Sequence, residues 1–320
     1  MPKISVCIPT YNRASLLPLA IESVLQQTES DFEIIVCDDG STDQTAEVIS
    51  QFKDPRVRYI RHSHNIGKSN NMRSGFEAAT GIYFIKFDDD DRLTPEFLEK
   101  TSAILNHHPE IDFVGTDHWL IDIHNERNLQ TTNSNSQFWG RTLLPEGIIP
   151  NLLTVVFVQQ SLQVGATLFR RQALQDVQFM RPNLQNCEDN DLFVRLALAG
   201  KTAYYLPDRL MEYRVHAEQQ GIQRAIPYLK DKISYLQSYQ FTDINLEKAR
   251  LSRLAETKLL LGLRLVQVSD AQSARLLIWQ GRSASPLKAG IGLSFSLIPN
   301  KWRQHSFRLL HQLKLAVNSR

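Results

Sequence analysis

The stretch Tyr83-Phe-Ile-Lys-Phe-Asp-Asp-Asp-Asp91 joins a short, mostly apolar run to four consecutive carboxylates. The run has the length of a buried strand, and the carboxylates follow at its carboxyl end. Two earlier segments have the same arrangement: Pro9-Thr-Tyr-Asn12 follows an apolar run at residues 4–8, and Asp38-Asp39 follows another at 32–37. Because ligands of α/β sheets bind beyond the carboxyl ends of the strands, we expect these three segments to meet at one crevice.

Helical patterns separate these strands. Apolar residues recur at helical spacing over residues 16–25, 46–52 and 69–79, and a further strand is predicted at 57–61. Thr94-Pro95 is expected to open another helix, as its cap and first helical residue. Strands that alternate with helices at this spacing predict an α/β domain with a mostly parallel sheet flanked by helices.

The second half of the chain is less regular. It predicts strands at residues 113–123, 164–169 and 203–206, a polar loop at 125–136, and a helix at 188–199 that ends before Gly200. From about residue 222, Leu, Arg and Gln dominate at helical spacing. We therefore expect an α/β domain over residues 1–220 and a helical C-terminal region over 221–320.

Composition excludes several classes of protein. The 320 residues are 42% hydrophobic and 22% charged, and a net charge of +2 gives no case for nucleic-acid binding. The three cysteines are far apart and match no zinc motif. No secretory signal and no uncharged apolar run of about 18 residues is present, so we expect a cytoplasmic protein, or one that lies against a membrane without crossing it.

The four carboxylates of residues 88–91 predict a metal site. Adjacent carboxylates repel one another in an enclosed cleft, and a hard divalent cation, Mg²⁺ or Mn²⁺, relieves that repulsion. Mg²⁺ takes few protein ligands and completes its shell with phosphate and water, so such a cluster suits a metal–diphosphate unit. The structural alternative is a solvated acidic turn that caps the next helix.

Three other segments can carry chemistry, and each has a structural alternative. Asp38 and Asp39 could accept hydrogen bonds from a ribose or a base, although an Asp-Gly turn and a helix cap explain the residues that follow. Glu188 and Asp189 suit the first turn of a helix, where a carboxylate could also be a general base. In the fourth segment, Tyr213-Arg-Val-His216, His216 could ligate a metal and Arg214 could neutralise a leaving diphosphate.

Taken in order, these segments resemble family 2 glycosyltransferases, an inverting group with the GT-A fold. The resemblance rests on Ser5-Val-Cys-Ile-Pro-Thr-Tyr-Asn12, Ile34-Ile-Val-Cys-Asp-Asp-Gly-Ser-Thr-Asp43, Asn65-Ile-Gly67 with Asn71, Gly81-Ile-Tyr-Phe-Ile-Lys-Phe-Asp-Asp-Asp-Asp91, Glu188-Asp189 and Tyr213-Arg-Val-His216. It covers about residues 3–220. Each segment is weak evidence alone, whereas the ordered set is specific.

The resemblance implies a transfer of sugar from a nucleotide-sugar donor, with a UDP-sugar as the first expectation, to a saccharide or lipid-linked acceptor. It implies a setting in cell-surface polysaccharide biosynthesis. Asp189 would be the catalytic base, with Glu188 as the alternative, and Arg214 would contact the donor diphosphate. The implied metal residues are Asp88, Asp90, Asp91 and His216, with Asp89 able to replace one of the DxD pair. The implied nucleotide-binding residues are Pro9, Thr10, Tyr11, Asn12, Asp38, Asp39 and Asn71.

Other classes of protein fit the sequence less well. A sugar nucleotidyltransferase usually begins with a Gly-rich phosphate loop, where this chain has Pro9-Thr-Tyr-Asn-Arg13, and an NAD-dependent enzyme would need GxGxxG. A calcium-binding subunit is disfavoured because residues 88–91 lack the alternating ligands of an EF-hand. A catalytically idle nucleotide-sugar-binding subunit would be expected to lose the acidic pairs, which are present.

The C-terminal segment poses a separate question. Residues 271–320 contain no Asp or Glu but carry eight Lys and Arg residues. Peripheral contact with an anionic membrane is one explanation, since the segment also contains Trp279, Leu293, Phe295, Ile298, Trp302, Phe307, Leu309 and Leu310. The alternative is a basic helical cap or an oligomer contact.

Overall fold

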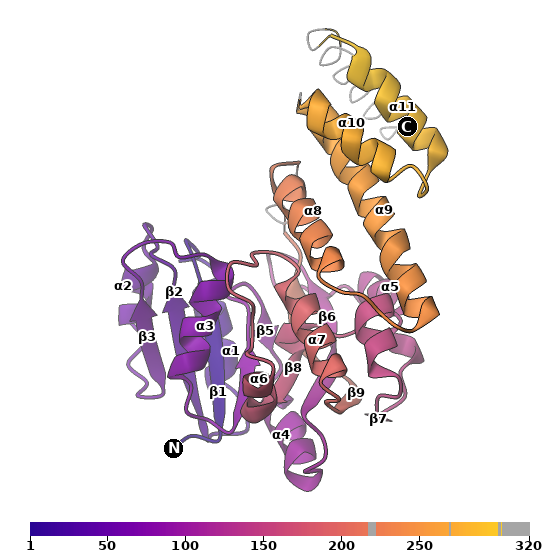
Figure 1. Ribbon diagram of the computed structural model, residues 1–320. Coiled ribbons are helices and arrows are strands. Elements are labelled where there is room, and N and C mark those ends of the chain that lie inside the picture. The colour runs from indigo at the N-terminus through magenta and orange to yellow at the C-terminus, as the bar shows by residue number, and fades with distance from the viewer. Residues whose placement is uncertain (217–221, 269, 300–301, 303–320) are drawn as a thin grey trace. The chain divides into compact units, whose positions relative to one another are not determined.

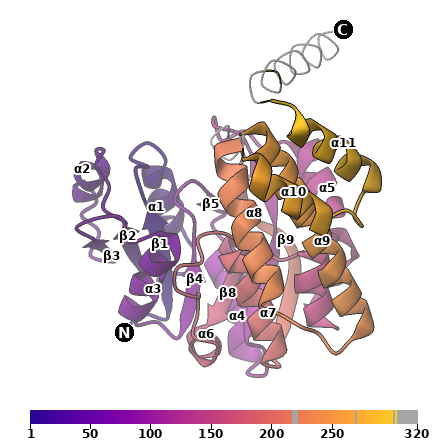
Figure 2. The same cartoon turned by 45° about the horizontal axis from the view of Figure 1, so that its top comes forward.

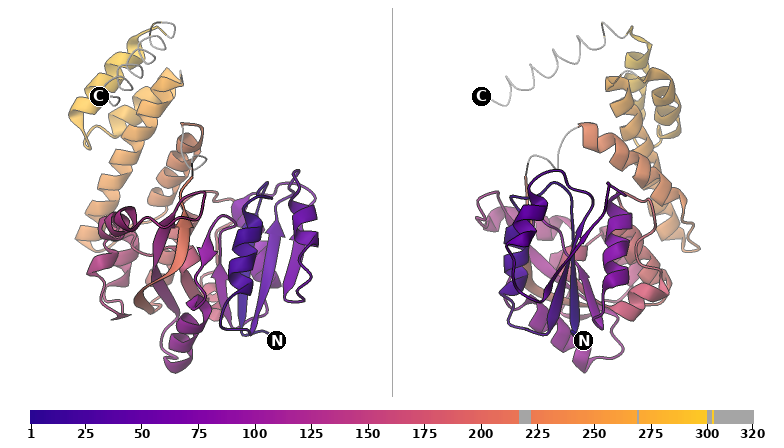
Figure 3. Two further views of the ribbon diagram at one scale, coloured as in Figure 1. Left: turned by 180° about the vertical axis from the view of Figure 1, so that it is seen from behind. Right: turned by 90° about the vertical axis from the view of Figure 1, so that its left-hand side faces the viewer.

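The computed structural model describes residues 1–216, 222–268, 270–299 and 302. The chain divides into two compact units, Met1–Ala217 and Glu218–Arg320. The first unit is a nine-stranded sheet with helices on both faces, as Figure 1 and the right-hand view of Figure 3 show. Its strand order is β3-β2-β1-β4-β8-β6-β9-β5, and β7 also pairs with β9.

The first half of this unit follows the predicted alternation of strands and helices. Its elements are β1 (Ile4–Thr10), α1 (Leu17–Leu25), β2 (Phe32–Asp38), α2 (Thr45–Ser50), β3 (Val57–Arg61), α3 (Lys68–Ala78), β4 (Tyr83–Lys86), β5 (Arg92–Leu93) and α4 (Phe97–His107). Strands β3, β2, β1 and β4 are parallel, with Thr10 opposite Asp38 at the carboxyl ends of β1 and β2. The predicted crevice therefore lies at this edge of the sheet.

Beyond β4 the sheet is mixed. Its elements are β6 (Phe113–Ile121), α5 (Leu129–Phe138), η1 (Arg141–Leu143), β7 (Gly147–Ile148), η2 (Thr154–Gln159), η3 (Val164–Ala166), β8 (Thr167–Arg170), α6 (Arg171–Asp176), α7 (Glu188–Leu198) and β9 (Ala203–Arg214). Strand β8 runs antiparallel to both β4 and β6, whereas β6 and β9 are parallel. Strand β9 continues eight residues past the predicted end, and this extension brings Arg214 to the carboxyl edge.

The two faces of the sheet are covered by different helices, because successive side chains of a strand point to opposite faces. One face packs Val6, Ile34 and Ile85 against α1 and α4 in a single apolar cluster. On the other face the ring of Phe84 contacts Phe76 of α3, and Phe169 of β8 contacts Phe193 of α7. Helices α3 and α7 thus share one face, which also carries Lys86 because it is two residues from Phe84.

Two predictions about local structure were wrong. The polar stretch 125–136 contains a helix, α5, because the Asn128 side chain caps it by accepting from Thr131 N at 2.9 Å. Its small polar residues are buried against β6, where Ser136 Oγ donates to Asp117 Oδ2 at 2.7 Å. Helix α4 does not begin at Thr94-Pro95 but at Phe97, since Thr94 is held to β9 by hydrogen bonds from its N and Oγ1 to Leu210 O.

The second unit is helical. It contains α8 (Ile222–Gln237), α9 (Ile244–Gln267), α10 (Ala271–Gln280) and α11 (Pro286–Leu297), which Figure 2 shows from a second side. Leu259, Leu265 and Ile278 belong to its small apolar core. Gly262 allows α9 and α10 to approach closely, because a Cβ there would lie 2.6 Å from Ile278 Cγ1.

Candidate active site

A cavity of about 340 Å³ lies where the loops after β1, β2 and β4 meet. Six residues predicted from the sequence line it: Pro9, Thr10, Tyr11, Asp39, Asn71 and Asp88. Arg13, Asn65, Gly67, Lys68, Asp89 and Gln185 complete its lining. Three segments that are distant in sequence therefore form one site, as the strand-end rule predicts.

Asp39 and Asn71 both line the cavity. The Asp39 carboxylate accepts from Ile66 N at 2.6 Å and from Gly67 N at 3.1 Å, and burial raises its pKa. Asn71 Nδ2 donates to Cys37 O at 2.7 Å, while its Oδ1 is buried with no hydrogen-bond partner among the described residues. A buried, unpaired amide oxygen that lines a cavity is a ready acceptor for a ligand donor group.

Asp38 and Asn12, both predicted to bind the nucleotide, do not line the cavity. Asp38 is fully buried and accepts from Tyr59 Oη at 2.5 Å and from Ser41 N at 2.8 Å. Asn12 has a left-handed backbone with φ 53°, and its Oδ1 accepts from Thr42 N at 2.8 Å. Asp38 and Asn12 thus each accept a hydrogen bond from a backbone N–H of the loop after β2.

The four carboxylates of residues 88–91, the acidic run, make contacts with different partners. Asp88 Oδ1 accepts from Lys86 Nζ at 2.7 Å, and Asp90 Oδ2 lies 2.9 Å from His216 Nε2. Asp89 lines the cavity, where burial and the neighbouring carboxylate of Asp90 raise its pKa to about 7. A proton on Asp89 near neutral pH would relieve part of the repulsion within the run.

Asp91 lies deepest in the run. Its Oδ1 accepts from Arg214 N at 2.8 Å, and its buried Oδ2 has no hydrogen-bond partner in the part of the chain that the structure describes. Burial and the charges of Asp90 and Asp88 raise its pKa well above the usual range. No group of three or more His, Cys, Asp or Glu side chains that could hold a metal ion is found among the described residues, so metal binding by Asp88, Asp90, Asp91 and His216 stays a prediction.

Arg214 does not face the cavity. Its side chain is fully buried, and its guanidinium donates to Asp90 O at 2.6 Å, Asp122 O at 2.7 Å and Asn125 Oδ1 at 2.7 Å. These bonds tie the acidic run to the turn after β6. This position differs from the predicted contact with a donor diphosphate.

Glu188 and Asp189 begin α7, as predicted. Cys187, with φ 62°, turns the chain directly before them. The almost fully buried Glu188 places its Oε1 2.6 Å from Nζ of Lys68, whose side chain is 43% exposed. Asp189 Oδ2 lies 4.0 Å from Lys86 Nζ, and its Oδ1 has no hydrogen-bond partner among the described residues. Burial is the main cause that raises the pKa of Asp189 to about 6.

Sequence reasoning missed four polar residues at this site: Arg13, Lys68, Lys86 and Gln185. Lys86 carried a signal, since a lysine two residues before Asp88 in a strand shares its face. Lys68 and Gln185 carried none, because their partners are distant in sequence: Gln185 Oε1 accepts from Lys68 N at 2.7 Å across 117 positions.

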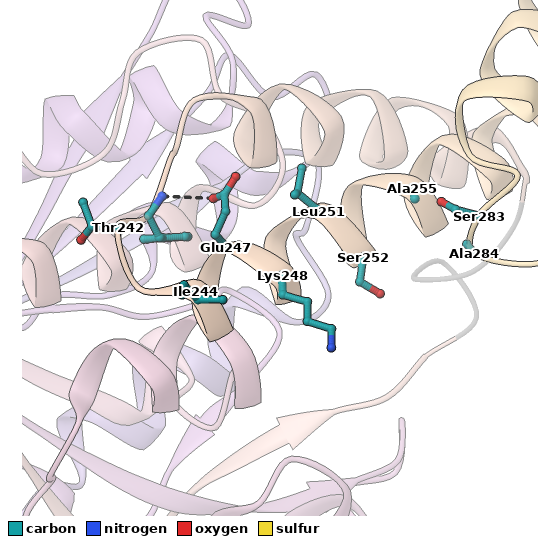
Figure 4. A pocket seen from close by; sticks show the side chains of 10 residues that line it. Thr242, Ile244, Glu247, Lys248, Leu251, Ser252, Ala255, Ser283 and Ala284 are labelled. Atoms are coloured by element: carbon teal, nitrogen blue, oxygen red, sulfur yellow. Dashed lines mark hydrogen bonds between the residues drawn. The ribbon is translucent and has the colours of Figure 1, made fainter.

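A second hollow belongs to the helical unit and contains none of the predicted site residues. Figure 4 shows this pocket of about 580 Å³, which is lined by Phe241, Thr242, Ile244, Glu247, Lys248, Leu251, Ser252, Ala255, Ser283 and Ala284. Its one drawn hydrogen bond runs from Phe241 N to Glu247 Oε2 at 3.1 Å. Glu247 also pairs with Arg250, so its carboxylate is already engaged by donors of the protein itself.

Comparisons with known proteins agree with this geometry. The model of glycosyl transferase family 2 matches residues 5–176, more than half of the chain. An uncharacterized glycosyltransferase of Haemophilus influenzae is 27% identical over 224 residues, covering 68% of this chain and 67% of the relative. The GalNAc(5)-diNAcBac-PP-undecaprenol beta-1,3-glucosyltransferase of Campylobacter jejuni is 41% identical over 96 residues, which are 29% of this chain and 31% of the relative.

Solved structures show the same fold. Residues 1–349 of S. aureus TarS in complex with UDP-GlcNAc match with a TM-score of 0.60 at 16% identity, over 96% of this chain and 92% of theirs. The mannosyltransferase PcManGT of Pyrobaculum calidifontis in complex with GDP-Man and Mn2+ matches with a TM-score of 0.59, over 99% of this chain and 86% of its own. This chain covers 55% of the longer TarS chain.

The chain belongs to glycosyl transferase family 2, and it is a glycosyltransferase with the GT-A fold. Both the family and the fold class predicted from the ordered motifs are therefore confirmed.

Proposed function

We propose that this protein transfers a sugar from a nucleotide-sugar donor to a hydroxyl of a saccharide or lipid-linked acceptor, with inversion and with the help of a divalent metal. The observation that carries this proposal is that the carboxylates of Asp88 and Asp189 both lie close to Lys86. Asp88 lines the cavity, and Lys86 Nζ lies 2.7 Å from Asp88 Oδ1 and 4.0 Å from Asp189 Oδ2. These short distances support a donor site and a catalytic base close to each other.

We propose a role for each of the residues expected to bind the nucleotide. Asp39 and Asn71 would accept hydrogen bonds from the nucleoside, and the half-exposed ring of Tyr11 would pack near the base. Thr10 and Pro9 complete this wall. We propose indirect roles for Asp38 and Asn12, which shape the loops through the hydrogen bonds described above.

The chemistry of the acidic run fits Mg²⁺ or Mn²⁺. Asp90 Oδ2 lies 2.9 Å from His216 Nε2, and Oδ2 of Asp91, in the same run, has no hydrogen-bond partner within the described part of the chain. A donor-site metal needs few protein ligands, because phosphate oxygens and water complete its shell. Such an ion would supply positive charge that stabilises the departing diphosphate. For Arg214 we propose that it braces this loop, because its guanidinium is already fully used.

Asp189 would carry the proton transfer. The acceptor O–H attacks the anomeric carbon, the bond from that carbon to the diphosphate oxygen breaks, and the hydroxyl proton passes to the Asp189 carboxylate. The nucleoside diphosphate leaves with the bonding electron pair. A single displacement inverts the anomeric centre and needs no covalent intermediate.

The comparisons suggest candidates for both substrates. A related structure contains UDP-GlcNAc and another contains GDP-Man, so a UDP-sugar is our first choice of donor, ahead of GDP-mannose. The Campylobacter relative is named for an acceptor on undecaprenol diphosphate. We therefore propose a lipid-linked saccharide acceptor and a place in cell-surface polysaccharide assembly.

A nucleotide panel tests the donor site. We expect one of UDP, GDP, dTDP or CDP to raise the melting temperature of the protein by several degrees only when Mn²⁺ is present, because ligands that bind the folded state stabilise it by mass action. Differential scanning fluorimetry of each nucleotide, with and without Mn²⁺, measures this. A flat response to all four would favour the idle-subunit alternative.

We also propose that the second unit contacts anionic membranes. Leu287 and Ile291, one turn apart on α11, are 75% and 51% exposed, and Arg282 lies 4.1 Å from the centre of the exposed Trp279 ring. Phe307, Leu309 and Leu310, also named in the sequence analysis, lie outside the described residues. Within the described part of the chain, no helix has the length and apolarity needed to cross a bilayer.

Vesicle flotation tests this surface. We expect the protein to float with vesicles that contain phosphatidylglycerol and not with pure phosphatidylcholine, because basic residues add an electrostatic attraction to apolar insertion. The Leu287→Ser, Ile291→Ser double variant should reduce the bound fraction at least about fivefold. Ile244→Ser, which removes an exposed apolar side chain from α9, is the matched control. Equal flotation of the wild type, the double variant and the control would contradict the proposal that α11 contacts the membrane.

A further inference from the structure

Lys86 is a fully buried lysine in the middle of the sheet. It lies in β4 between β1 and β8, and its backbone pairs with Cys7 in β1. A buried ammonium group is costly unless a carboxylate compensates it. Two carboxylates approach its Nζ: Asp88 Oδ1 at 2.7 Å and Asp189 Oδ2 at 4.0 Å. The surroundings therefore keep Lys86 charged.

The two carboxylates belong to different parts of the site. Asp88 follows β4 directly and lines the donor cavity. Asp189 comes from the first turn of α7, about a hundred residues later in the sequence, and its Oδ1 accepts no hydrogen bond from any described residue. One ammonium group thus connects the wall of the donor cavity to the proposed base.

We propose that Lys86 is a positioning residue, which holds the Asp189 carboxylate ionised and oriented beside the donor cavity. This inference rests on the proposed function, in which Asp189 is the base. It adds a specific task for a residue that the reaction scheme does not otherwise use.

The charges that face Asp189 come from three elements. Lys86 and Asp88 belong to β4 and its end, Lys68 to α3, and Glu188 to α7 itself. Burial raises the pKa of Asp189 to about 6, Lys86 and Lys68 lower it, and Glu188 and Asp88 raise it. Of the two lysines, Lys68 forms its ion pair with Glu188 at 2.6 Å, and Lys86 is the one that lies within 4.0 Å of Asp189.

The direction of the pH effect follows. Asp189 removes a proton only when it is ionised, so kcat/KM should be half-maximal near pH 6, approach its plateau about one pH unit higher, and fall further as the pH drops below 6. Loss of the Lys86 cation would favour the protonated form of Asp189. The acidic limb of the profile should then move to higher pH.

Lys86→Met tests the proposal, because methionine keeps the volume and removes the charge. We expect the acidic limb of kcat/KM to rise by about one pH unit or more, and kcat on the plateau to fall about tenfold. The nucleotide- and Mn²⁺-dependent thermal shift should be retained. Lys100→Met, which breaks a surface pair with Asp208, is the matched control and should keep the wild-type limb.

A double variant distinguishes the effect of Lys86 on Asp189 from a role in which Lys86 only compensates the charge of Asp88. Lys86→Met with Asp88→Asn removes both charges of the 2.7 Å pair, and so protects the fold if the single variant is unstable. We expect the limb to stay above that of the wild type, because Lys86 acts on Asp189 more strongly than Asp88 does. A wild-type limb in either folded variant would overturn the proposal.

The same profiles distinguish failure of the proposed function. If the wild type transfers sugar with no acidic limb near pH 6, the assignment of Asp189 as base fails, whatever Lys86 does. If the wild type shows the limb and Lys86→Met leaves it in place, only the role of Lys86 fails.

Discussion

Replacing Asp189 with asparagine is expected to lower the rate of sugar transfer by about 10³-fold, because a general base contributes roughly 10² to 10⁴ in rate. Asparagine has nearly the same shape but cannot take the acceptor proton. The carboxylate is poised for this task, since its Oδ1 has no hydrogen-bond partner among the described residues and its pKa is raised to about 6. The loss should appear in kcat, while nucleotide binding is kept.

The measurement is release of nucleoside diphosphate from the nucleotide sugar that the panel selects, either with an acceptor or with water as a slow substitute. Glu188→Gln is the matched comparison, since it changes the same charge one residue away. We expect a much smaller loss there, because Glu188 is paired with Lys68 at 2.6 Å. A large loss in Glu188→Gln with an active Asp189→Asn would assign the base to Glu188.

Replacing Asp90 with alanine is expected to abolish the Mn²⁺-dependent part of nucleotide binding. Asp90 contacts His216 at 2.9 Å, and its removal leaves the run without its best-placed metal oxygen. If the dissociation constant rises 100-fold, the stabilisation at a nucleotide concentration of 100 times the original constant falls from about 2.7 to about 0.4 kcal/mol. His216→Ala should have the same direction of effect.

Thermal shift and calorimetric titration with the selected nucleotide measure this effect. Asp208→Ala is the control, because it removes an exposed carboxylate of β9 that is paired with Lys100 and lies outside the donor cavity. Full Mn²⁺-dependent binding in Asp90→Ala would exclude this residue as a ligand and direct attention to Asp88 or Asp91. Binding that is weakened equally with and without Mn²⁺ would point to damage of the loop instead.

The sequence was informative wherever a residue acts through its place on a strand. Thr10, Asp39 and Asp88 follow three apolar runs, and parallel pairing of β1, β2 and β4 brings their carboxyl ends to one edge. That inference needs only the alternation of strands and helices. The ordered motifs were specific enough to indicate the family, which the match over residues 5–176 confirms.

Local patterns failed where burial overrides propensity. Helix α5 forms in a stretch of Asn, Thr and Ser because Asp117 and Leu120 of β6 bond its buried hydroxyls, and no local signal contains those partners. Likewise the cap at Thr94 is replaced by bonds to Leu210, 116 positions away. Intrinsic propensity describes an isolated segment, whereas the conformation of a folded segment also depends on the residues that pack against it.

What the sequence determined by itself was the alternation of strands and helices from β1 to β4, the edge at which the site forms and the types of residue found there. The tertiary structure decided what each charged group does. Asp39 lines the cavity, whereas Asp38 accepts a hydrogen bond from Tyr59. Arg214 donates to the backbone of Asp90, and Lys86 lies close to both Asp88 and Asp189. The physical reason is that a strand's period of two sets the face of a side chain, but the partner of a buried charge is set by residues that only folding brings within a few ångströms.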